Sequence, residues 1–308
     1  MPQSPGQAKV SLCFRSLAAL DAIHRYRYLG VRQVATICDV NLKSSSEMLL
    51  RLERGRLLRH FGNVGIRGYG KTPKVYFLKK HGHALLAEER EAQGFEIGSF
   101  RQANISTRWS PIMFHRLDTL DVLACVERDC QKLSEYDLID TLVEFRRERF
   151  GRRWRNETTD FVAEGSKPSD KIVPDAGFAL RHIESGKIAL FLIEIDRGTT
   201  RLTTEQDDGD VATYIDKLAQ YDRYLASGRI ADRHPRLGRF SGFHLLTVTT
   251  SARRIDSMRS AATAALSPKF HKYFRFSTLD RVRRNVLHDG WLSRDHADPT
   301  NYSLIKGK

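Results

Sequence analysis

Three carboxylates in the middle of the chain have the types and spacing needed for metal-dependent chemistry. Asp175 follows Lys171-Ile172-Val173-Pro174, while Glu194 and Asp196 end a strand that begins with the apolar run 188–193. Side chains two residues apart in a strand point to the same side, so Glu194 and Asp196 should face the same way. Three converging negative charges need a cation, and hard oxygen ligands favour Mg²⁺ or Mn²⁺. The pattern is typical of a metal-dependent nuclease centre.

Strands and helices around these acids indicate the scaffold that holds them. The run 188–193 is apolar at every position, as in a strand buried on both faces. Hydrophobic spacing predicts further strands and helices in mixed order, which indicates an α/β domain with a central sheet covered by helices. The predicted strands are 137–145, 176–181, 243–250 and 273–277, and the predicted helices are 113–124, 212–227 and 252–266.

The first part of the chain has a different order of elements. Apolar spacing predicts helices over 12–24, 31–38 and from Asn41 to about Gly55, then strands at 57–61 and 74–78 around a glycine-rich tip, and a closing helix near 82–91. This order is similar to a winged helix-turn-helix domain, whose third helix enters the major groove. The predicted DNA contacts are Lys43, Ser44 and Ser45 on that helix and Arg67, Lys71 and Lys74 on the wing. The alternative is a winged helix that docks a protein.

The charge of the chain favours a polyanionic partner. The formal net charge is +14, distributed as +8 over residues 1–100, −1 over 101–250 and +7 over 251–308. Within the balanced centre, an arginine cluster surrounds Trp154 and is a candidate phosphate clamp; its predicted DNA-binding members are Arg146, Arg147, Arg152 and Arg153. A solvated charged surface is the alternative.

Length and composition limit the remaining possibilities. The 308 residues allow one to three domains, and neither a membrane-spanning apolar run nor a signal segment is found, so a cytoplasmic protein is expected. The four cysteines are scattered, which predicts reduced, structural thiols.

Several sequence segments together resemble one known family. They are Phe114-His115-Arg116-Leu117, Val173 to Phe178, Phe191 to Thr199 and Lys217 to Tyr221. With the winged helix in front, they look like the replication-relaxation family of plasmid and mobile-element proteins, which includes relatives of MobC-type relaxases. The resemblance implies a restriction-endonuclease-like PD-(D/E)XK domain. The expected domains are a winged helix at 1–91, a linker at 92–111, the nuclease-like domain at 112–285 and a C-terminal tail at 286–308.

The resemblance also implies roles for individual residues. Asp175 would be the main metal-bridging carboxylate and Glu194 the second ligand, with the Ile195 carbonyl as a further donor. Asp196 stands where the PD-(D/E)XK pattern has a lysine that acts on the attacking water. Two alternatives remain open: Lys217 reaches the site from the following helix, or Asp196 becomes a third ligand or pairs with Arg197.

The nucleophile and the overall function also have alternatives. Tyr221 lies four residues after Lys217 and could attack the phosphodiester in place of water, or could belong to an apolar stripe packed on the sheet. The leading hypothesis is a protein that nicks or relaxes plasmid or mobile-element DNA. The alternatives are a non-catalytic replication accessory factor, a transcriptional regulator and an adaptor in a relaxosome. The expected partners are double-stranded DNA, a nicked or single strand, relaxosome or replication proteins, and a second copy of the chain.

Overall fold

The computed structural model describes residues 12–62, 65–66, 70–100, 103, 111–150, 153–163, 170–203 and 213–305. The chain divides into two compact units, Met1–Met113 and Phe114–Lys308. Both units combine helices with β-sheet, so the predicted α/β class is confirmed. Each unit is described by itself below.

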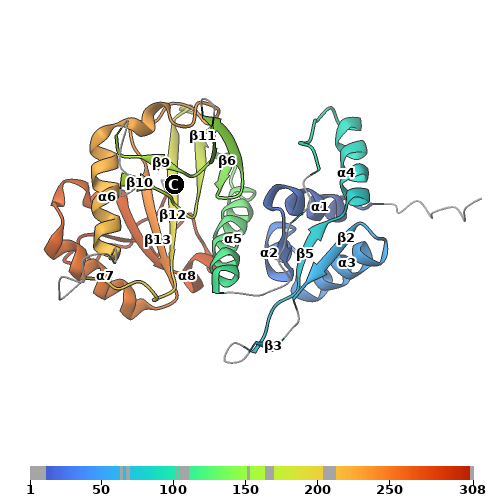
Figure 1. Cartoon of the computed structure of the whole chain (residues 1–308), viewed down its shortest axis with the longest axis horizontal. Helices are drawn as coiled ribbons and strands as arrows, with labels where there is room; N and C mark the ends of the chain where they lie inside the picture. Colours follow the sequence, from blue (N-terminus) through green and yellow to red (C-terminus); the bar gives the residue numbers. More distant parts are fainter. Residues whose placement is uncertain are drawn as a thin grey trace, which may run out of the picture. The chain divides into compact units, whose positions relative to one another are not determined.

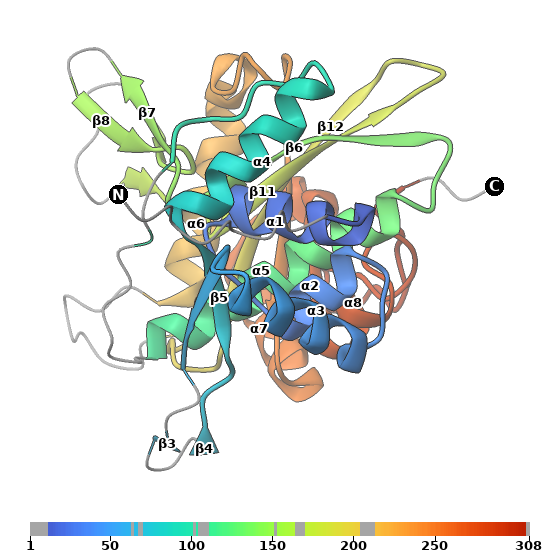
Figure 2. The same ribbon diagram turned by 90° about the vertical axis from the view of Figure 1, so that its right-hand side faces the viewer.

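The first unit contains three helices followed by a β-hairpin and a fourth helix. Strands β1, β5 and β2 form an antiparallel sheet in that order, and β3 pairs with β4 beyond the ends of β2 and β5 (Figure 2). The helices and strands predicted for this region are all present in the predicted order. The elements are α1 (Phe14–Tyr26), β1 (Leu29–Gly30), α2 (Val31–Ile37), α3 (Leu42–Arg54), β2 (Leu58–Phe61), β3 (Gly65–Ile66), β4 (Gly70–Lys71), β5 (Val75–Leu78) and α4 (Lys80–Ala92).

Local sequence signals fix the ends of the helices in this unit. The Asn41 side chain accepts a hydrogen bond from the Ser44 amide at 2.8 Å and so caps α3. Helix α4 comes so near to β2 that a Cβ at Gly82 would lie 2.2 Å from the Leu57 carbonyl oxygen. Only glycine permits this approach.

The second unit is built on a six-stranded sheet of order β15-β14-β13-β12-β11-β6. The pairs β12–β13 and β13–β14 are parallel, and the other pairs are antiparallel. The sheet strands are β6 (Tyr136–Val143), β11 (Ala176–His182), β12 (Ile188–Asp196), β13 (His244–Thr249), β14 (Phe274–Thr278) and β15 (Leu292–Ser293). The four strands predicted at 137–145, 176–181, 243–250 and 273–277 are β6, β11, β13 and β14, and the predicted buried strand is β12.

Helices cover both faces of this sheet. In Figure 1, α6 (Tyr214–Ser227) lies on one side of the strands and α5 (Pro111–Cys130) on the other. Thr213 begins α6 with a capping box, in which the Thr213 hydroxyl accepts from the Asp216 amide and the Asp216 carboxylate accepts from the Thr213 amide. The apolar face of α6 joins one hydrophobic core with β11 to β14 and with α7 (Ala252–Ala265). The chain between the parallel strands β13 and β14 also includes η3 (Pro268–Tyr273).

Two parts of this unit differ from the sequence-based description. The segment 286–308, expected as a tail, continues the fold as far as Ile305: β15 joins the sheet, and Trp291 is buried. Helix α8 (Leu279–Arg284) leads into it. Within the arginine cluster the chain forms an unpredicted hairpin of β7 (Arg147–Phe150) and β8 (Arg153–Asn156). Two short strands, β9 (Asp160–Phe161) and β10 (Lys171–Ile172), pair with each other.

Candidate active site

The register of β11 and β12 brings the predicted acids together. Ala176 is the partner of Ile193 in this antiparallel pair, so Asp175 comes beside Glu194. The Asp175 amide donates to the Ile193 carbonyl at 3.0 Å, and the Ile195 amide donates to Asp175 Oδ2 at 2.8 Å. The Pro-Asp segment is therefore joined by hydrogen bonds to the end of the buried strand.

Glu194 is buried and is held by two side chains of α6. Lys217 Nζ donates to Glu194 Oε2, and the Tyr221 hydroxyl donates to Glu194 Oε1. Lys217 and Tyr221 are four residues apart and so share one face of the helix. The predicted approach of Lys217 from the following helix is therefore present.

Burial and neighbouring charge set the protonation of this group. Burial raises the pKa of Glu194 to about 7, although the Lys217 ammonium acts in the opposite direction. Burial acts to lower the pKa of Lys217, but the charges of Glu194 and Asp175 outweigh it and the pKa lies above its ordinary value. Lys217 therefore remains a cation.

Asp175 has a second partner that sequence analysis did not assign. His115 Nε2 of α5 lies 2.9 Å from Asp175 Oδ1. This hydrogen bond raises the pKa of His115. Burial acts to raise the pKa of Asp175, but the hydrogen bond from His115 and the charge of Lys217 hold it below its ordinary value. An ionised Asp175 thus lies between His115 and the Lys217–Glu194 pair.

Asp196, the third predicted ligand, pairs elsewhere. Arg254 of α7 contacts both of its carboxylate oxygens, with Nε 2.9 Å from Oδ2 and Nη2 3.3 Å from Oδ1. The Gly198 amide also donates to Asp196 Oδ2. The structure thus brings Asp175, Glu194 and Lys217 together and directs Asp196 to a separate ion pair.

Further ion pairs connect α5 to the end of β12 and to α8. Arg197, directly after β12, pairs with Asp118, and Arg283 of α8 pairs with Asp121. His115, Asp118 and Asp121 are spaced by three residues on α5, so they lie along neighbouring turns. The Arg197–Asp118 pair uses the arginine that was considered as an alternative partner of Asp196.

Asp175 and Glu194 provide part of the donor set that a divalent cation needs. Across the portion of the chain that the structure describes, no three histidine, cysteine, aspartate or glutamate side chains are arranged to hold a metal. Asp175 and Glu194 still offer four carboxylate oxygens, each with a second lone pair, and the Ile195 carbonyl is next to them in sequence. These are the hard donors that Mg²⁺ and Mn²⁺ prefer.

The tyrosines of α6 are buried among their hydrogen-bond partners. Tyr221 is 1% exposed, and its pKa is well above the ordinary value because of burial and the charge of Glu194. The Tyr214 hydroxyl lies 2.6 Å from Thr247 Oγ1. These positions match the predicted apolar stripe better than the predicted nucleophile.

The predicted DNA contacts of the first unit are in different environments. Lys43, Ser44 and Lys71 are exposed, and Lys74 is half-buried. Ser45, by contrast, is fully buried and donates to the Val31 carbonyl at 3.0 Å, so it does not reach a ligand. Arg67 lies outside the described residues.

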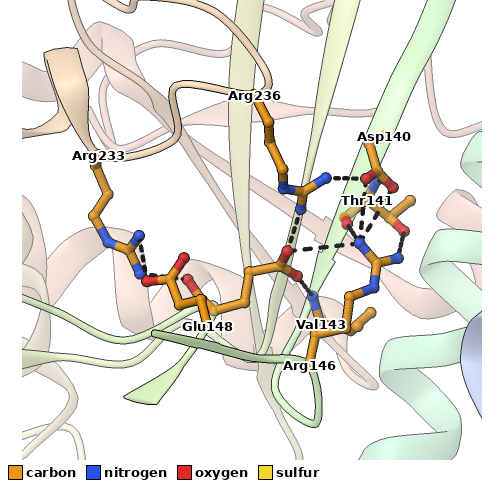
Figure 3. Close-up of polar contacts among 8 residues, drawn as sticks. Asp140, Thr141, Val143, Arg146, Glu148, Arg233 and Arg236 are labelled. Carbon is orange, nitrogen blue, oxygen red and sulfur yellow. Dashed lines mark hydrogen bonds and ion pairs between the residues drawn. The ribbon is translucent and has the colours of Figure 1, made fainter. Parts of the chain in front are cut away.

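The arginine cluster of the second unit also divides into two groups. Arg146 Nη1 donates to Asp140 Oδ2 at 3.2 Å and to the Thr141 carbonyl oxygen at 2.8 Å, and Arg236 lies nearby (Figure 3). Arg147 is exposed. Arg152 lies outside the described residues, and for Arg153 the structure describes the backbone alone.

Comparison with protein families identifies a family that covers both units in part. The profile of replication-relaxation proteins matches residues 20–238, which is more than two thirds of the chain. The chain belongs to the replication-relaxation family. This membership, expected from the sequence motifs, associates the protein with replication of plasmids and other mobile elements.

The replication-relaxation match includes His115, Asp175, Glu194, Lys217 and Tyr221, and it ends before β13. Comparisons with curated proteins and with solved structures gave no match. Among the described helices of this family member, none has the length and apolar character needed to span a bilayer.

Proposed function

We propose that this replication-relaxation protein binds DNA and nicks one strand by metal-dependent attack of water on a phosphodiester. The observation that carries this proposal is the hydrogen bond from Lys217 Nζ to Glu194 beside Asp175. A restriction-endonuclease-like centre needs two acids and one lysine. Here the lysine comes from α6, since position 196 is an aspartate.

Each residue of the centre then has a role. Asp175 and Glu194 would hold the cation, with the Ile195 carbonyl as a further donor. A bound Mg²⁺ or Mn²⁺ supplies Lewis acidity at the scissile phosphate. The Lys217 ammonium orients the attacking water and stabilises negative charge that develops on phosphate oxygens. His115 orients Asp175 through its 2.9 Å contact.

The first unit would act as a winged helix that holds the duplex. Exposed Lys43 and Ser44 at the start of α3, and Lys71 on β4, suit contacts with bases and phosphates. DNA and replication proteins are the partners that the family indicates.

A non-catalytic function is the second candidate, and one observation favours it. All four carboxylate oxygens of Asp175 and Glu194 already accept hydrogen bonds from the protein, and the Lys217 ammonium lies beside Glu194. Such a cluster could hold the sheet to α5 and α6 without a metal. The protein would then be a DNA-binding replication accessory factor or regulator.

A plasmid-relaxation assay separates the two candidates. Supercoiled plasmid carrying the cognate region is incubated with the protein in Mg²⁺, Mn²⁺ or EDTA, and open circles are counted. Nicking requires metal in the wild type and is lost in Asp175→Asn. Asp232→Asn makes the same chemical change at a carboxylate that is 80% exposed, and it should nick normally. If the wild type and Asp175→Asn both leave the plasmid supercoiled while binding it equally, the nicking proposal fails.

A further inference from the structure

The hairpin β7–β8 has two chemically different faces. Glu148 is opposite Arg155 in its register, whereas Arg149 is opposite Trp154 and Arg147 is opposite Asn156. Neighbouring strand residues point to opposite sides, so the second set shares one face. We call this set, Arg147, Arg149, Trp154 and Asn156, the outer face of the hairpin.

The inner face is attached to the body of the unit. Arg155 Nε donates to Glu148 Oε1 at 2.7 Å. Arg233 Nη1 lies 2.7 Å from the same carboxylate oxygen (Figure 3). The Arg233 side chain is only 4% exposed, and it also donates to the carbonyls of Glu157 and Thr159. The buried Arg233 thus connects the inner face of the hairpin to the body of the unit through Glu148.

The outer face presents an aromatic ring among arginines. Trp154 is 59% exposed, and Arg147, Arg149 and Asn156 are exposed as well. Arg147 and Arg149 are two residues apart along β7, so their Cα atoms are about 7 Å apart. A large apolar ring exposed on the same face as two arginines suits a ligand with both flat apolar faces and negative charges.

Nucleic acid has both properties, and the exposed indole of Trp154 favours a single strand over a duplex. An indole stacks on a base only where that base is unpaired, because the bases of a duplex are already stacked on each other. Aromatic stacking combined with backbone-tracking cations is the usual way in which single strands are bound. An acidic peptide could pair with the arginines, but its carboxylate side chains would not stack on the Trp154 indole.

We propose that the outer face of the β7–β8 hairpin binds single-stranded DNA, with the Trp154 indole stacked on an unpaired base and Arg147 and Arg149 at the neighbouring phosphates. This deepens the proposed function and rests on it, since a protein that nicks one strand handles unpaired DNA. The face does not include the residues of the candidate active site.

Binding of fluorescein-labelled 20-nucleotide oligo(dT) in EDTA tests the proposal without cleavage. Trp154→Ala weakens the affinity for oligo(dT) by roughly 5- to 150-fold, the range for loss of one stacked base. Trp154→Phe retains most of the affinity. Replacing Arg147 and Arg149 together by alanine makes the negative slope of log affinity against log salt shallower by about 1.4, which is the value for two phosphate contacts on a single strand. Arg239→Ala, an exposed arginine of the same unit, changes neither quantity.

A 20-base-pair duplex, oligo(U) and a poly-glutamate peptide are the discriminating probes. The proposal requires that Trp154→Ala leaves duplex affinity unchanged. Equal losses for duplex and oligo(dT), tighter binding of oligo(U), or full competition by the peptide would each overturn it. So would wild-type affinity in both Trp154 variants.

Failure of the two proposals is distinguishable. If the wild type does not nick plasmid but Trp154→Ala loses oligo(dT) binding, only the nicking proposal fails. If the wild type nicks and Trp154→Ala binds oligo(dT) normally, only the hairpin proposal fails.

Discussion

Lys217 of α6 donates a hydrogen bond to Glu194 of β12, 23 residues earlier in the chain. Position 196, where the PD-(D/E)XK pattern has a lysine, is an aspartate in this chain. In the mechanism that we propose, the Lys217 ammonium of the next helix takes the place of that lysine, so the position of the charge in space matters more than its place in the sequence.

Replacement of Lys217 tests that view. Lys217→Met keeps the length of the side chain but removes the ammonium, and we expect the plasmid-nicking rate to fall by about 10²- to 10³-fold, as on loss of one charge-stabilising donor. Lys217→Arg should retain part of the rate. The matched control is Lys187→Met in the exposed turn before β12, which should nick normally. Unchanged nicking in Lys217→Met would remove this lysine from the proposed mechanism.

Tyr221→Phe distinguishes a structural hydroxyl from a nucleophile. The variant leaves one oxygen of the buried Glu194 without its donor, so the free energy of unfolding should fall by about 1–3 kcal/mol. The nicking rate should remain within a few fold, because water attacks in the proposed mechanism. Urea denaturation and the plasmid assay measure the two quantities.

Tyr214→Phe is the matched control for this experiment. Its hydroxyl bonds to the neutral Thr247, so its loss should cost less, about 0.5–1.5 kcal/mol. A stable Tyr221→Phe protein without nicking activity, together with a covalent protein–DNA product in the wild type, would instead identify Tyr221 as the nucleophile.

Lys43→Ala tests duplex binding by the first unit. Lys43 is exposed at the amino end of α3, so its removal should weaken duplex binding. The negative slope of log affinity against log salt should become shallower by about 0.9, the value for one phosphate contact. Lys80→Ala removes the same positive charge from an exposed position of α4, and it should have no effect on duplex binding. Measurement of affinity at several salt concentrations gives both values. A larger loss in Lys80→Ala than in Lys43→Ala would place the duplex on another surface.

Sequence patterns predicted those parts of the fold that depend on hydrophobic periodicity. The apolar run 188–193 identified β12, and hydrophobic spacing over 212–227 identified α6. The hairpin β7–β8 was missed because its short strands consist mostly of charged residues and have no regular apolar alternation. Its contact with the body of the unit is made by Arg233, which is 85 residues after Glu148.

The partners of the candidate site were harder to predict, since they come from distant segments. Asp175 and Glu194 were found because strand geometry relates them, but the contact between His115 and Asp175 depends on how α5 packs on the sheet. Likewise, Asp196 pairs with Arg254 from a helix that follows the next parallel strand. Ser45 illustrates the same limit on α3: helical spacing allowed either face, and packing against α2 buried it.

The stability of the second unit should fall in acid partly through His244. Burial, followed by the charge of Arg275, lowers the pKa of His244 to about 4, and the ring stacks on Phe191 with centroids 5.5 Å apart. The unfolded chain has the ordinary histidine pKa near 6.5, so protonation favours unfolding. The contribution is fully present above pH 6.5 and is lost as the pH falls from 6.5 towards 4. His244→Phe keeps the stacked ring without the titration, so at pH 4 its loss of unfolding free energy relative to pH 7 should be about 3 kcal/mol smaller than in the wild type. Some loss will remain, because burial also lowers the pKa of His234, to about 3.

Denaturant titrations between pH 4 and 7 give the comparison, with the exposed His296→Gln as a control that should follow the wild-type curve. Parallel curves for His244→Phe and the wild type would contradict the assignment.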